Sequence, residues 1–531
     1  MKTIIHDIFA AVLLAAGIPA TAAAGNPVQE YIEAAADGTV LGNAGFGMLA
    51  VTSGGDTLAA YGFRRAMVPA SNMKLITTGA ALHRLGADYR YKTGIGYSGT
   101  VKDGILHGDL YIIGGGDPTI ASRDSIAVPV EQTFRQWRQF IADAGIKRIE
   151  GHIVGDDRFF DRVMEEDSWL WNDLGTYYGT GVSGLSFYEN VQDFNVAPGA
   201  VPGEAVKVSP GYPEAPWMEY RYSCTTGEPG TGNKLYYYTS SLAPVGEMRG
   251  TFASDRAPKT EEGSNKFPAY TCAWHFMEYL RGCGVECSEG AADLGDTFGL
   301  PEGTVCPADS ITVIGSTISP TLKRITFETN FESNNFFAET VFKTLGREFS
   351  GKGSYETGRQ AVKSILSDLG VKCNGVKIQD GSGLSRQNYI SPEFFCTFLN
   401  AMLGSPAASD YLMTMPSPGS NGTMSYLMSR YASETKSRIL IKSGSMDGVL
   451  CYSGYILPPG VTSAEVLSCM TGQNPAFGTD ASLGRNDIII FSIMTNNCTS
   501  SPYRVRQILE KILYLLTTEI PSAGVNAGQE R

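Results

Sequence analysis

The sequence predicts a mixed α/β protein, α+β in arrangement, that is built from more than one domain. Its 531 residues are enough for two to four domains with apolar cores. From residue 72 onward, apolar side chains recur at helical spacing as far as Gly86, a natural helix stop. Further along, Lys442-Ser443-Gly444 closes one β-rich run and a second run follows. Both helices and strands are therefore expected.

Charge and histidine content exclude several function classes. The net charge is -12 and no run of five or more Lys or Arg occurs, so we expect no nucleic-acid partner. The five histidines are scattered, and no Cys/His cluster has the spacing of a metal site. Neither a metal nor another cofactor is expected.

The first 24 residues read as a secretory signal. A short basic start precedes an apolar run at residues 8–16 and small residues at 22–24. The apolar run is shorter than the ~20 residues that a membrane span needs, which makes a membrane anchor the less favoured alternative. No later stretch predicts a transmembrane span. We therefore expect secretion across the inner membrane and a periplasmic location.

Ten cysteines fit an oxidising compartment, but the sequence does not determine how they pair. Cys396 lies within an apolar helical pattern, so we expect a buried thiol there rather than a bridge.

The stretch "VPASNMKLITTG" places a serine at the start of the first predicted helix. Ser71 lies at or beside the helix N-terminus, and Lys74 follows three residues later on the same face. The Lys74 amine can therefore reach the Ser71 hydroxyl, and the helix terminus favours developing negative charge. The simple alternative is an N-cap serine beside a solvated lysine, because a bare S-x-x-K pattern occurs by chance in most proteins of this length.

Two further elements give this pair more weight. Ser333-Asn334-Asn335 precedes an amphipathic helix at residues 336–345, and Lys442-Ser443-Gly444 follows near the C-terminal end. The three elements resemble the S-x-x-K, S-x-N and K-[ST]-G elements of penicillin-interacting serine acyltransferases, in the order that they take there.

Each element has a chemical reason. Ser71 is the expected nucleophile and Lys74 its base, because a lysine that is buried beside a second cation, here Lys442, loses its proton readily. Ser333 is expected to carry a proton to the leaving amine. Asn335 is expected to hold Lys74 and a substrate amide.

The third element is expected to bind the substrate backbone. The N–H groups of Ser71 and Ser445 can form an oxyanion hole, and a substrate strand would run beside Ser443 and Gly444.

A histidine-based triad is the rival mechanism. It lacks both a G-x-S-x-G elbow and a histidine near Ser71.

Ser71 and Ser333 are 262 positions apart, more than a single-domain β-lactamase needs, so we expect an insertion between them. The sequence also carries "LYIIGGGDP", "GDD..FD", "W.WNDL", "DGSGLSRQNYISP", "MPSPGSNGTM" and "FSIMTNN". With these motifs, the chain from about Gln29 to about Leu516 resembles the class C low-molecular-mass penicillin-binding proteins. These form the D-Ala-D-Ala carboxypeptidase/endopeptidase (DacB, peptidase S13) family.

The resemblance implies the serine β-lactamase/DD-peptidase transpeptidase fold. A five-stranded antiparallel sheet with helices on both faces would be interrupted by an inserted domain II, and a domain III would be nested within it. The division we expect is residues 1–24 for the signal, 25–94 and 311–520 for the transpeptidase domain, 95–191 and 259–310 for domain II, 192–258 for domain III and 521–531 for a tail. Residues 194–252 read as short strands, 268–284 as a helix, and 503–520 as an amphipathic helix that we expect on the sheet rather than on a membrane surface.

The resemblance also implies an activity. The enzyme would hydrolyse D-alanyl bonds in peptidoglycan peptides, as a serine-type D-Ala-D-Ala carboxypeptidase, a DD-endopeptidase or both, through an acyl-enzyme at Ser71. β-Lactam antibiotics would acylate the same serine as covalent inhibitors. Family substrate contacts fall on Asp173 and Arg386, which would hold the ammonium and carboxylate of a diamino acid. Asp173 could equally cap a turn and Arg386 could form a structural ion pair. A homodimer is left open.

Two positions depart from the family pattern. Ser443 stands where threonine is usual, which keeps the hydroxyl, so we expect activity to persist with a shifted β-lactam preference. Asn334 stands where aspartate is common, at a position outside the catalytic pair.

The alternative functions are a β-lactamase or esterase with the same chemistry, and a non-catalytic wall-binding scaffold. The scaffold would have lost a Ser, Lys or Asn, and none is lost.

Overall fold

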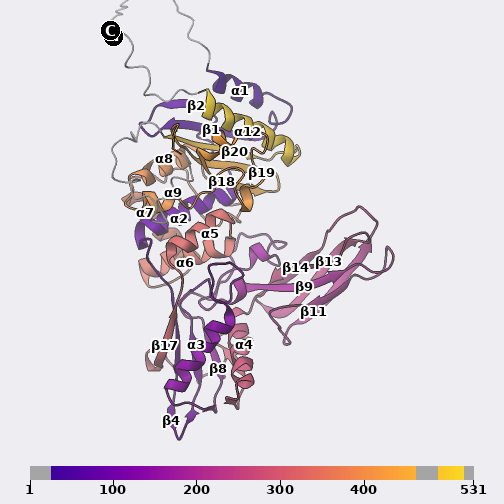
Figure 1. Cartoon of the computed structure of the whole chain (residues 1–531), viewed down its shortest axis with the longest axis vertical. Helices are drawn as coiled ribbons and strands as arrows, with labels where there is room; N and C mark the ends of the chain where they lie inside the picture. The colour runs from indigo at the N-terminus through magenta and orange to yellow at the C-terminus, as the bar shows by residue number, and fades with distance from the viewer. Residues whose placement is uncertain (1–25, 462–487, 520–531) are drawn as a thin grey trace, which may run out of the picture.

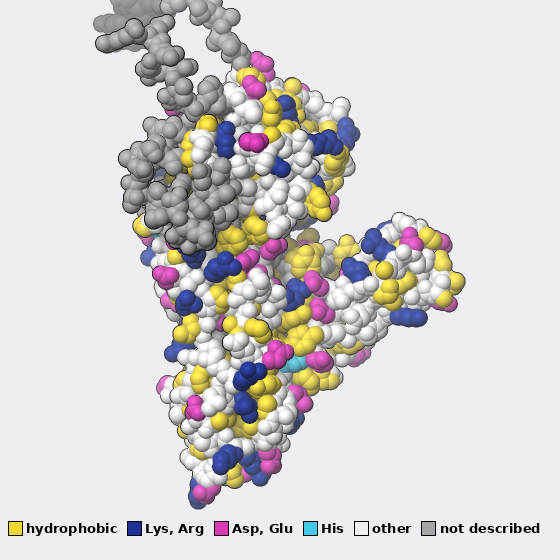
Figure 2. All heavy atoms as spheres, viewed as in Figure 1, with side chains coloured by type: hydrophobic (Ala, Val, Ile, Leu, Met, Phe, Trp, Pro, Cys, Tyr) yellow, Lys and Arg dark blue, Asp and Glu magenta, His cyan; other side chains and the backbone are white. Residues whose placement is uncertain are grey.

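The structure is a computed structural model that describes residues 26–461 and 488–519. Figure 1 shows an upper body that carries α1 and α12, an elongated lower lobe, and an arm that projects sideways near their junction. The expected signal at 1–24 and the tail at 521–531 lie outside the described residues. On the face drawn in Figure 2, basic and acidic side chains are interspersed.

The upper body is built on one five-stranded sheet whose neighbouring strands are all antiparallel. The strand order is β18-β19-β20-β1-β2, so the two N-terminal strands lie beside three C-terminal ones. The strands are β1 (Gly45–Thr52), β2 (Thr57–Tyr61), β18 (Ile439–Met446), β19 (Val449–Ile456) and β20 (Ile489–Asn496). The expected five-stranded antiparallel sheet is thereby confirmed.

Helices cover both faces of this sheet, because successive side chains of a strand point to opposite sides. In β1, Met48 packs in the core beneath α1 (Pro27–Ala36) and α12 (Pro502–Thr518), while Leu49 packs in the core on the other side. The α12 helix lies on the sheet, as expected. The second face is covered mainly by α2 (Met73–Leu85), α5 (Leu322–Phe331), α6 (Asn335–Ser350), α7 (Tyr355–Asp368), α8 (Pro392–Leu403) and α9 (Ala408–Leu412), and the short α10 (Ser433–Ser437) precedes β18.

The lower lobe is formed by the chain between α2 and α5, from which the arm also arises. One sheet has the order β16-β8-β6-β3-β17 and a smaller one β15-β7-β5-β4, with α3 (Val130–Asp143) and α4 (Pro268–Gly282) packed against them. The strands are β3 (Lys92–Tyr97), β4 (Thr100–Lys102), β5 (Ile105–His107), β6 (Leu110–Ile113), β7 (Arg148–Ile149), β8 (Ile153–Asp156), β15 (Glu286–Cys287), β16 (Ala291–Asp293) and β17 (Thr312–Ile318).

The arm consists of two three-stranded sheets, ordered β10-β9-β14 and β11-β13-β12 (Figure 1). The expected short strands are present as β9 (Val191–Ala197), β10 (Lys207–Pro210), β11 (Glu219–Gly227), β12 (Tyr236–Ser240), β13 (Ala243–Ala253) and β14 (Lys259–Ser264). The expected helix after the arm is α4.

Strand pairing suggests one change to the domain boundaries, which otherwise stay a prediction. Strand β17 falls within the segment assigned to the transpeptidase domain from residue 311, yet it pairs with β3 in the lower lobe. We therefore propose that the chain returns to the upper body near Ser319.

Residues 157–190 of the inserted chain pack against the upper body. The Lys343 Nζ atom of α6 donates to Asp161 Oδ1 at 2.7 Å, and Tyr355 Oη of α7 donates to the Met164 carbonyl at 3.0 Å. Because Lys343, Tyr355 and Met164 are buried at these contacts, the inserted segment is held against α6 and α7.

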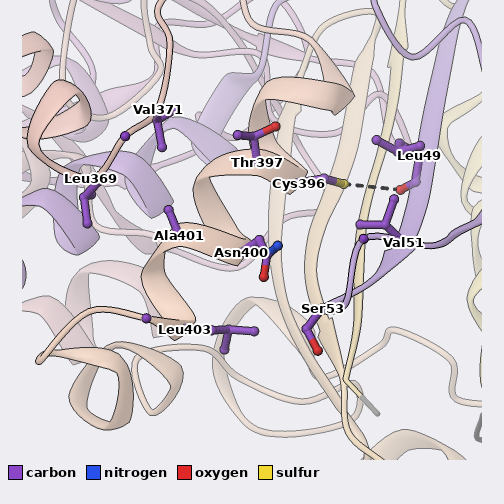
Figure 3. Close-up of a pocket in the computed structure, with 13 residues that line it drawn as sticks. Leu49, Val51, Ser53, Leu369, Val371, Cys396, Thr397, Asn400, Ala401 and Leu403 are labelled. Atoms are coloured by element: carbon purple, nitrogen blue, oxygen red, sulfur yellow. Dashed lines mark hydrogen bonds between the residues drawn. The ribbon is translucent and has the colours of Figure 1, made fainter. Parts of the chain in front are cut away.

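All nine cysteines within the described residues are free thiols, and Cys469 lies outside them. Cys396 is buried as expected, and its Sγ contacts the Leu49 carbonyl oxygen at 3.5 Å. It lines a cavity of about 560 Å³ between β1 and α8, with Val51, Asn400 and Leu403 (Figure 3). This cavity shares no residue with the three sequence elements.

Among the described helices, none is long and apolar enough to cross a membrane.

We expect Leu513→Ala to lower the free energy of unfolding by about 2–5 kcal/mol, because Leu513 is fully buried between α12 and the sheet and its loss leaves a cavity. Arg504→Ala, at an exposed position of the same helix, is the control and should change it by less than about 0.5 kcal/mol. Denaturant unfolding followed by circular dichroism measures both, and equal effects would contradict the packing of α12.

Candidate active site

A cavity of about 740 Å³ lies where the upper body meets the inserted segment, and its wall includes residues of the first two sequence elements and Ser445, which directly follows the third. Ser71, Ser333, Asn335 and Ser445 line it. The structure therefore brings together elements that are up to 374 positions apart in the sequence.

Ser71 lies in a 3-10 turn, Ala70–Asn72, that leads directly into α2. Ala70 has a φ of 45°, a left-handed conformation that is uncommon for a residue other than glycine. The turn is fixed because Gly383 packs against the Ala70 carbonyl, where a Cβ atom would stand 1.9 Å from the oxygen. The expected position of Ser71 at the start of a helix is confirmed.

Lys74 is fully buried in the first turn of α2. Its Nζ atom lies 3.0 Å from Ser71 Oγ, 2.6 Å from Asn335 Oδ1 and 3.0 Å from the Ser382 carbonyl oxygen. Burial lowers the pKa of Lys74 to about 7, although the negative charges of Glu339 and Asp380 act in the opposite direction. A large fraction of Lys74 is therefore neutral near pH 7 and able to accept a proton from Ser71. The alternative of a solvated lysine is wrong.

The middle element lies at the N-terminus of α6. Ser333 has a φ of 59°, and its Oγ accepts a hydrogen bond from Lys442 Nζ at 2.9 Å. Asn335 is the first residue of the helix and contacts Lys74 through Oδ1. Its Nδ2 donates to the Tyr178 carbonyl at 2.9 Å, which fixes the orientation of the amide and leaves one N–H for a ligand.

Lys442, on β18, is the second lysine of the site and is also fully buried. Its Nζ donates to Ser333 Oγ and, at 2.8 Å, to the Ser443 carbonyl. Burial, and then the charge of Lys74, lower the pKa of Lys442 well below its usual value. The positive charge on each ammonium disfavours protonation of the other lysine. The pair therefore gives up a proton more readily than either lysine alone would.

The edge of β18 faces the Ser71 turn. The Ile441 N–H donates to the Pro416 carbonyl at 2.9 Å, on the side away from β19. Since residues two apart in a strand direct their N–H groups to the same side, Ser443 and Ser445 present theirs at this free edge. Gly444 permits the close approach, because a Cβ atom there would stand 2.4 Å from the Pro69 carbonyl oxygen and 3.0 Å from the Ser71 nitrogen.

The "DGSGLSR" loop supports Lys74 from the opposite side. Asp380 accepts hydrogen bonds from the backbone N–H groups of Gly383 and Ser385 and from Trp169 Nε1. Glu339 accepts from the N–H groups of Gly381 and Ser382, which orients the Ser382 carbonyl toward Lys74. Burial and the charge of Asp380 raise the pKa of Glu339.

Sequence reasoning missed Glu339. The available signal was its position four residues after Asn335, on the same face of the helix.

Asp173 and Arg386 both line the cavity, as the resemblance implied. Asp173 Oδ1 accepts a hydrogen bond from Tyr178 Oη at 3.3 Å, and partial burial raises the Asp173 pKa while Arg386 opposes the shift. Arg386 donates through both terminal nitrogens to the Asp447 carbonyl at 3.2 Å. The turn after Asp173 is closed by its backbone carbonyl, so its side chain does not cap that turn, and Arg386 bonds a neutral oxygen rather than a carboxylate.

Arg123, Glu189 and Tyr236 are among the cavity residues that were not foreseen as site residues. They come from the lower lobe and the arm, and no local motif marks them. Within residues 26–461 and 488–519, no three His, Cys, Asp or Glu side chains gather as a metal site.

We expect the rate constant for acylation of Ser71 by benzylpenicillin to rise about tenfold per pH unit up to pH 7 and to level off above it, because only neutral Lys74 accepts the proton. Stopped-flow measurement of acylation provides the profile. A rate that is flat between about pH 5 and 9 would contradict Lys74 as the base.

Gly444→Ala should slow the same acylation by about 100-fold while the fold is retained, because the added Cβ pushes β18 away from the Ser71 turn. Gly282→Ala, where a Cβ meets nothing within 4 Å, is the matched control. If both variants react like the parent protein, the close approach of β18 has no part in the reaction.

The chain is similar to known proteins over most of its length. The model of the D-Ala-D-Ala carboxypeptidase 3 (S13) family matches residues 28–517. A D-alanyl-D-alanine carboxypeptidase of Actinomadura sp. is 30% identical over 452 residues, which cover 81% of this chain and 79% of that protein. The D-alanyl-D-alanine carboxypeptidase DacB of Haemophilus influenzae is 22% identical over 402 residues, which cover 75% of this chain and 79% of that protein.

Solved structures have the same fold. The crystal structure of penicillin binding protein 4 (dacB) from Haemophilus influenzae superimposes with a TM-score of 0.73 at 20% identity, covering 93% of this chain and 99% of that one. The same protein complexed with a β-lactam gives a TM-score of 0.69 at 19% identity, and the match covers 93% of this chain and 98% of that one. Because the family model spans nearly the whole described chain and a relative is 30% identical over most of its length, the protein belongs to the D-Ala-D-Ala carboxypeptidase 3 (S13) family.

Proposed function

We propose that the protein is a serine-type D-Ala-D-Ala carboxypeptidase that acts on peptidoglycan stem peptides, and on D-alanyl cross-bridges as a DD-endopeptidase, with Ser71 as the nucleophile. The observation that carries the proposal is the fully buried Lys74 amine, whose pKa is lowered to about 7, at 3.0 Å from Ser71 Oγ. A hydroxyl becomes an effective nucleophile when a neutral base lies within hydrogen-bond reach.

Acylation begins when Lys74 Nζ takes the Ser71 hydroxyl proton and Oγ attacks the carbonyl carbon of the penultimate D-alanine. The N–H groups of Ser71 and Ser445 stabilise the oxyanion. When the C–N bond breaks, the leaving amine takes a proton from the Ser333 hydroxyl, which Lys442 replaces across their 2.9 Å contact. The two lysines together then hold the same number of protons as at the start.

Deacylation requires Lys74 to be neutral again, so its proton first passes to Lys442. Lys74 then accepts a proton from water as the water attacks the acyl carbon. Collapse of the second tetrahedral intermediate returns that proton to Ser71 Oγ and releases the peptide acid, whose carboxyl proton then passes to solvent. The free N–H of Asn335 and the edge of β18 hold the substrate backbone throughout.

Asp173 and Arg386 are the proposed binding groups for a diamino acid side chain. One presents a carboxylate and the other a guanidinium to the same cavity, which suits a substrate end that carries both an ammonium and a carboxylate. The charges on this wall distinguish such a substrate from a small ester.

Residues 1–24 are the proposed export signal, and a location outside the cytoplasm, in the periplasm, follows from that proposal. A position at the cell wall suits an enzyme whose relatives are named for D-alanyl-D-alanine bonds.

We expect benzylpenicillin to form a covalent adduct on Ser71 that intact-protein mass spectrometry detects and peptide mapping locates. The mature protein with Ser71→Ala should form none, because the acylated oxygen is missing. An absent adduct without drug hydrolysis would favour a non-catalytic scaffold, and rapid drug hydrolysis without an adduct would favour a β-lactamase. Release of D-alanine from a pentapeptide, compared with cleavage of a cross-linked dimer, then separates carboxypeptidase from endopeptidase activity.

A further inference from the structure

The second residue of the middle element has a contact that the reaction scheme does not use. Asn334 caps α6, because its Oδ1 accepts the Phe337 N–H at 2.9 Å. Its Nδ2 donates to Glu189 Oε2, also at 2.9 Å. An ionised aspartate could provide the cap, but it has no donor for the second bond.

Glu189 is the carboxylate that receives this bond, and it comes from the inserted segment. It is 7% exposed at the wall of the catalytic cavity. Its other oxygen, Oε1, accepts from Ser122 Oγ at 2.7 Å and from the Arg123 N–H at 3.1 Å. The charged end of Arg123 bonds Glu262 instead, so the hydrogen bonds to Glu189 come from neutral donors.

The backbone that carries Glu189 is strained. Tyr188, Glu189 and Asn190 have φ values of 53°, 54° and 55°, three consecutive left-handed residues of which none is glycine. The fully buried Asn190 pins this turn, because its Oδ1 accepts the Phe187 N–H and its Nδ2 donates to the Gly181 carbonyl. Such strain persists only where the surroundings enforce it, and it concentrates at functional sites.

Asn334 lies between the two side chains that the reaction uses. Ser333 on one side is itself left-handed and contacts Lys442, and Asn335 on the other contacts Lys74. A shift of the backbone at Asn334 would therefore move both contacts.

We propose that Glu189 is a positioning residue, which holds Asn334 and through it sets the Ser333 and Asn335 side chains for acylation. The inference rests on the proposed function of Ser71. It also gives a reason for asparagine at position 334, since an aspartate at hydrogen-bond distance from Glu189 would place two negative charges in contact.

The test is a double-mutant cycle with Asn334→Asp, Glu189→Gln and the double variant, measured as the rate constant for Ser71 acylation by benzylpenicillin. Asn334→Asp should react about 100-fold more slowly, because two carboxylates repel each other. Glu189→Gln alone should react about tenfold more slowly, since its amide nitrogen meets another donor. In the double variant, the glutamine oxygen accepts from Ser122 and Arg123 and its nitrogen donates to the aspartate, so the rate should return to within about threefold of the parent.

The matched control is Asn334→Asp combined with Glu262→Gln, which neutralises a nearby carboxylate that does not touch Asn334. This control should stay as slow as Asn334→Asp. If the Glu189→Gln double variant is no faster than the control, the proposal is overturned. If Asn334→Asp does not fold, unchanged acylation in Glu189→Gln overturns it, and a tenfold loss at an unchanged thermal midpoint supports it.

Failure of the proposed function gives a different result. If the parent protein forms no adduct, Ser71 is not the nucleophile, and crystal structures of the variants decide the role of Glu189. The contact of Ser333 Oγ with Lys442 Nζ should then be lost in Asn334→Asp and present in the double variant. A contact that is kept in both would overturn the proposal.

Discussion

The chemistry of this protein depends on one buried amine. Lys74 is fully removed from solvent, and its three hydrogen-bond partners are neutral oxygens. Burying an ammonium without a carboxylate in contact is costly, so the neutral amine becomes competitive near pH 7. For Lys74 to be buried, α2, α6, β18 and the "DGSGLSR" loop must all pack around its side chain. The five-stranded sheet and the helices on its second face provide the support for that closure.

The inserted chain is part of this construction and not only an attachment to it. Its Tyr178 carbonyl orients the Asn335 amide, and Trp169 supports the loop that presents the Ser382 carbonyl to Lys74. Asp173 and Glu189 from the same segment line the cavity. A segment that begins after α2 and returns before α5 therefore contributes to the shape and charge of a site whose proposed reacting groups all lie in the upper body.

Several features of the fold could be predicted because they depend on local pattern. The helix after Ser71, the helix after Asn334 and the two strands around Lys442-Ser443-Gly444 follow from apolar periodicity and capping residues. Strand β17 joins the lower lobe through the partner it pairs with, and local pattern alone does not identify that partner, because β3 lies more than 200 residues earlier in the sequence. The five-stranded antiparallel sheet was expected from the family resemblance and not from periodicity, and its strand order came from the structure.

The sequence by itself predicted which groups take part in the proposed reaction, because Ser71 and Lys74 are brought together by helix geometry and the other two elements are recognisable as short strings. The tertiary structure alone decided how these groups are tuned. The burial of Lys74, the orientation of Asn335 and the supporting roles of Glu339 and Asp380 all depend on contacts between segments far apart in the chain. Desolvation and long-range hydrogen bonds are properties of packing, and no local pattern of residues encodes them.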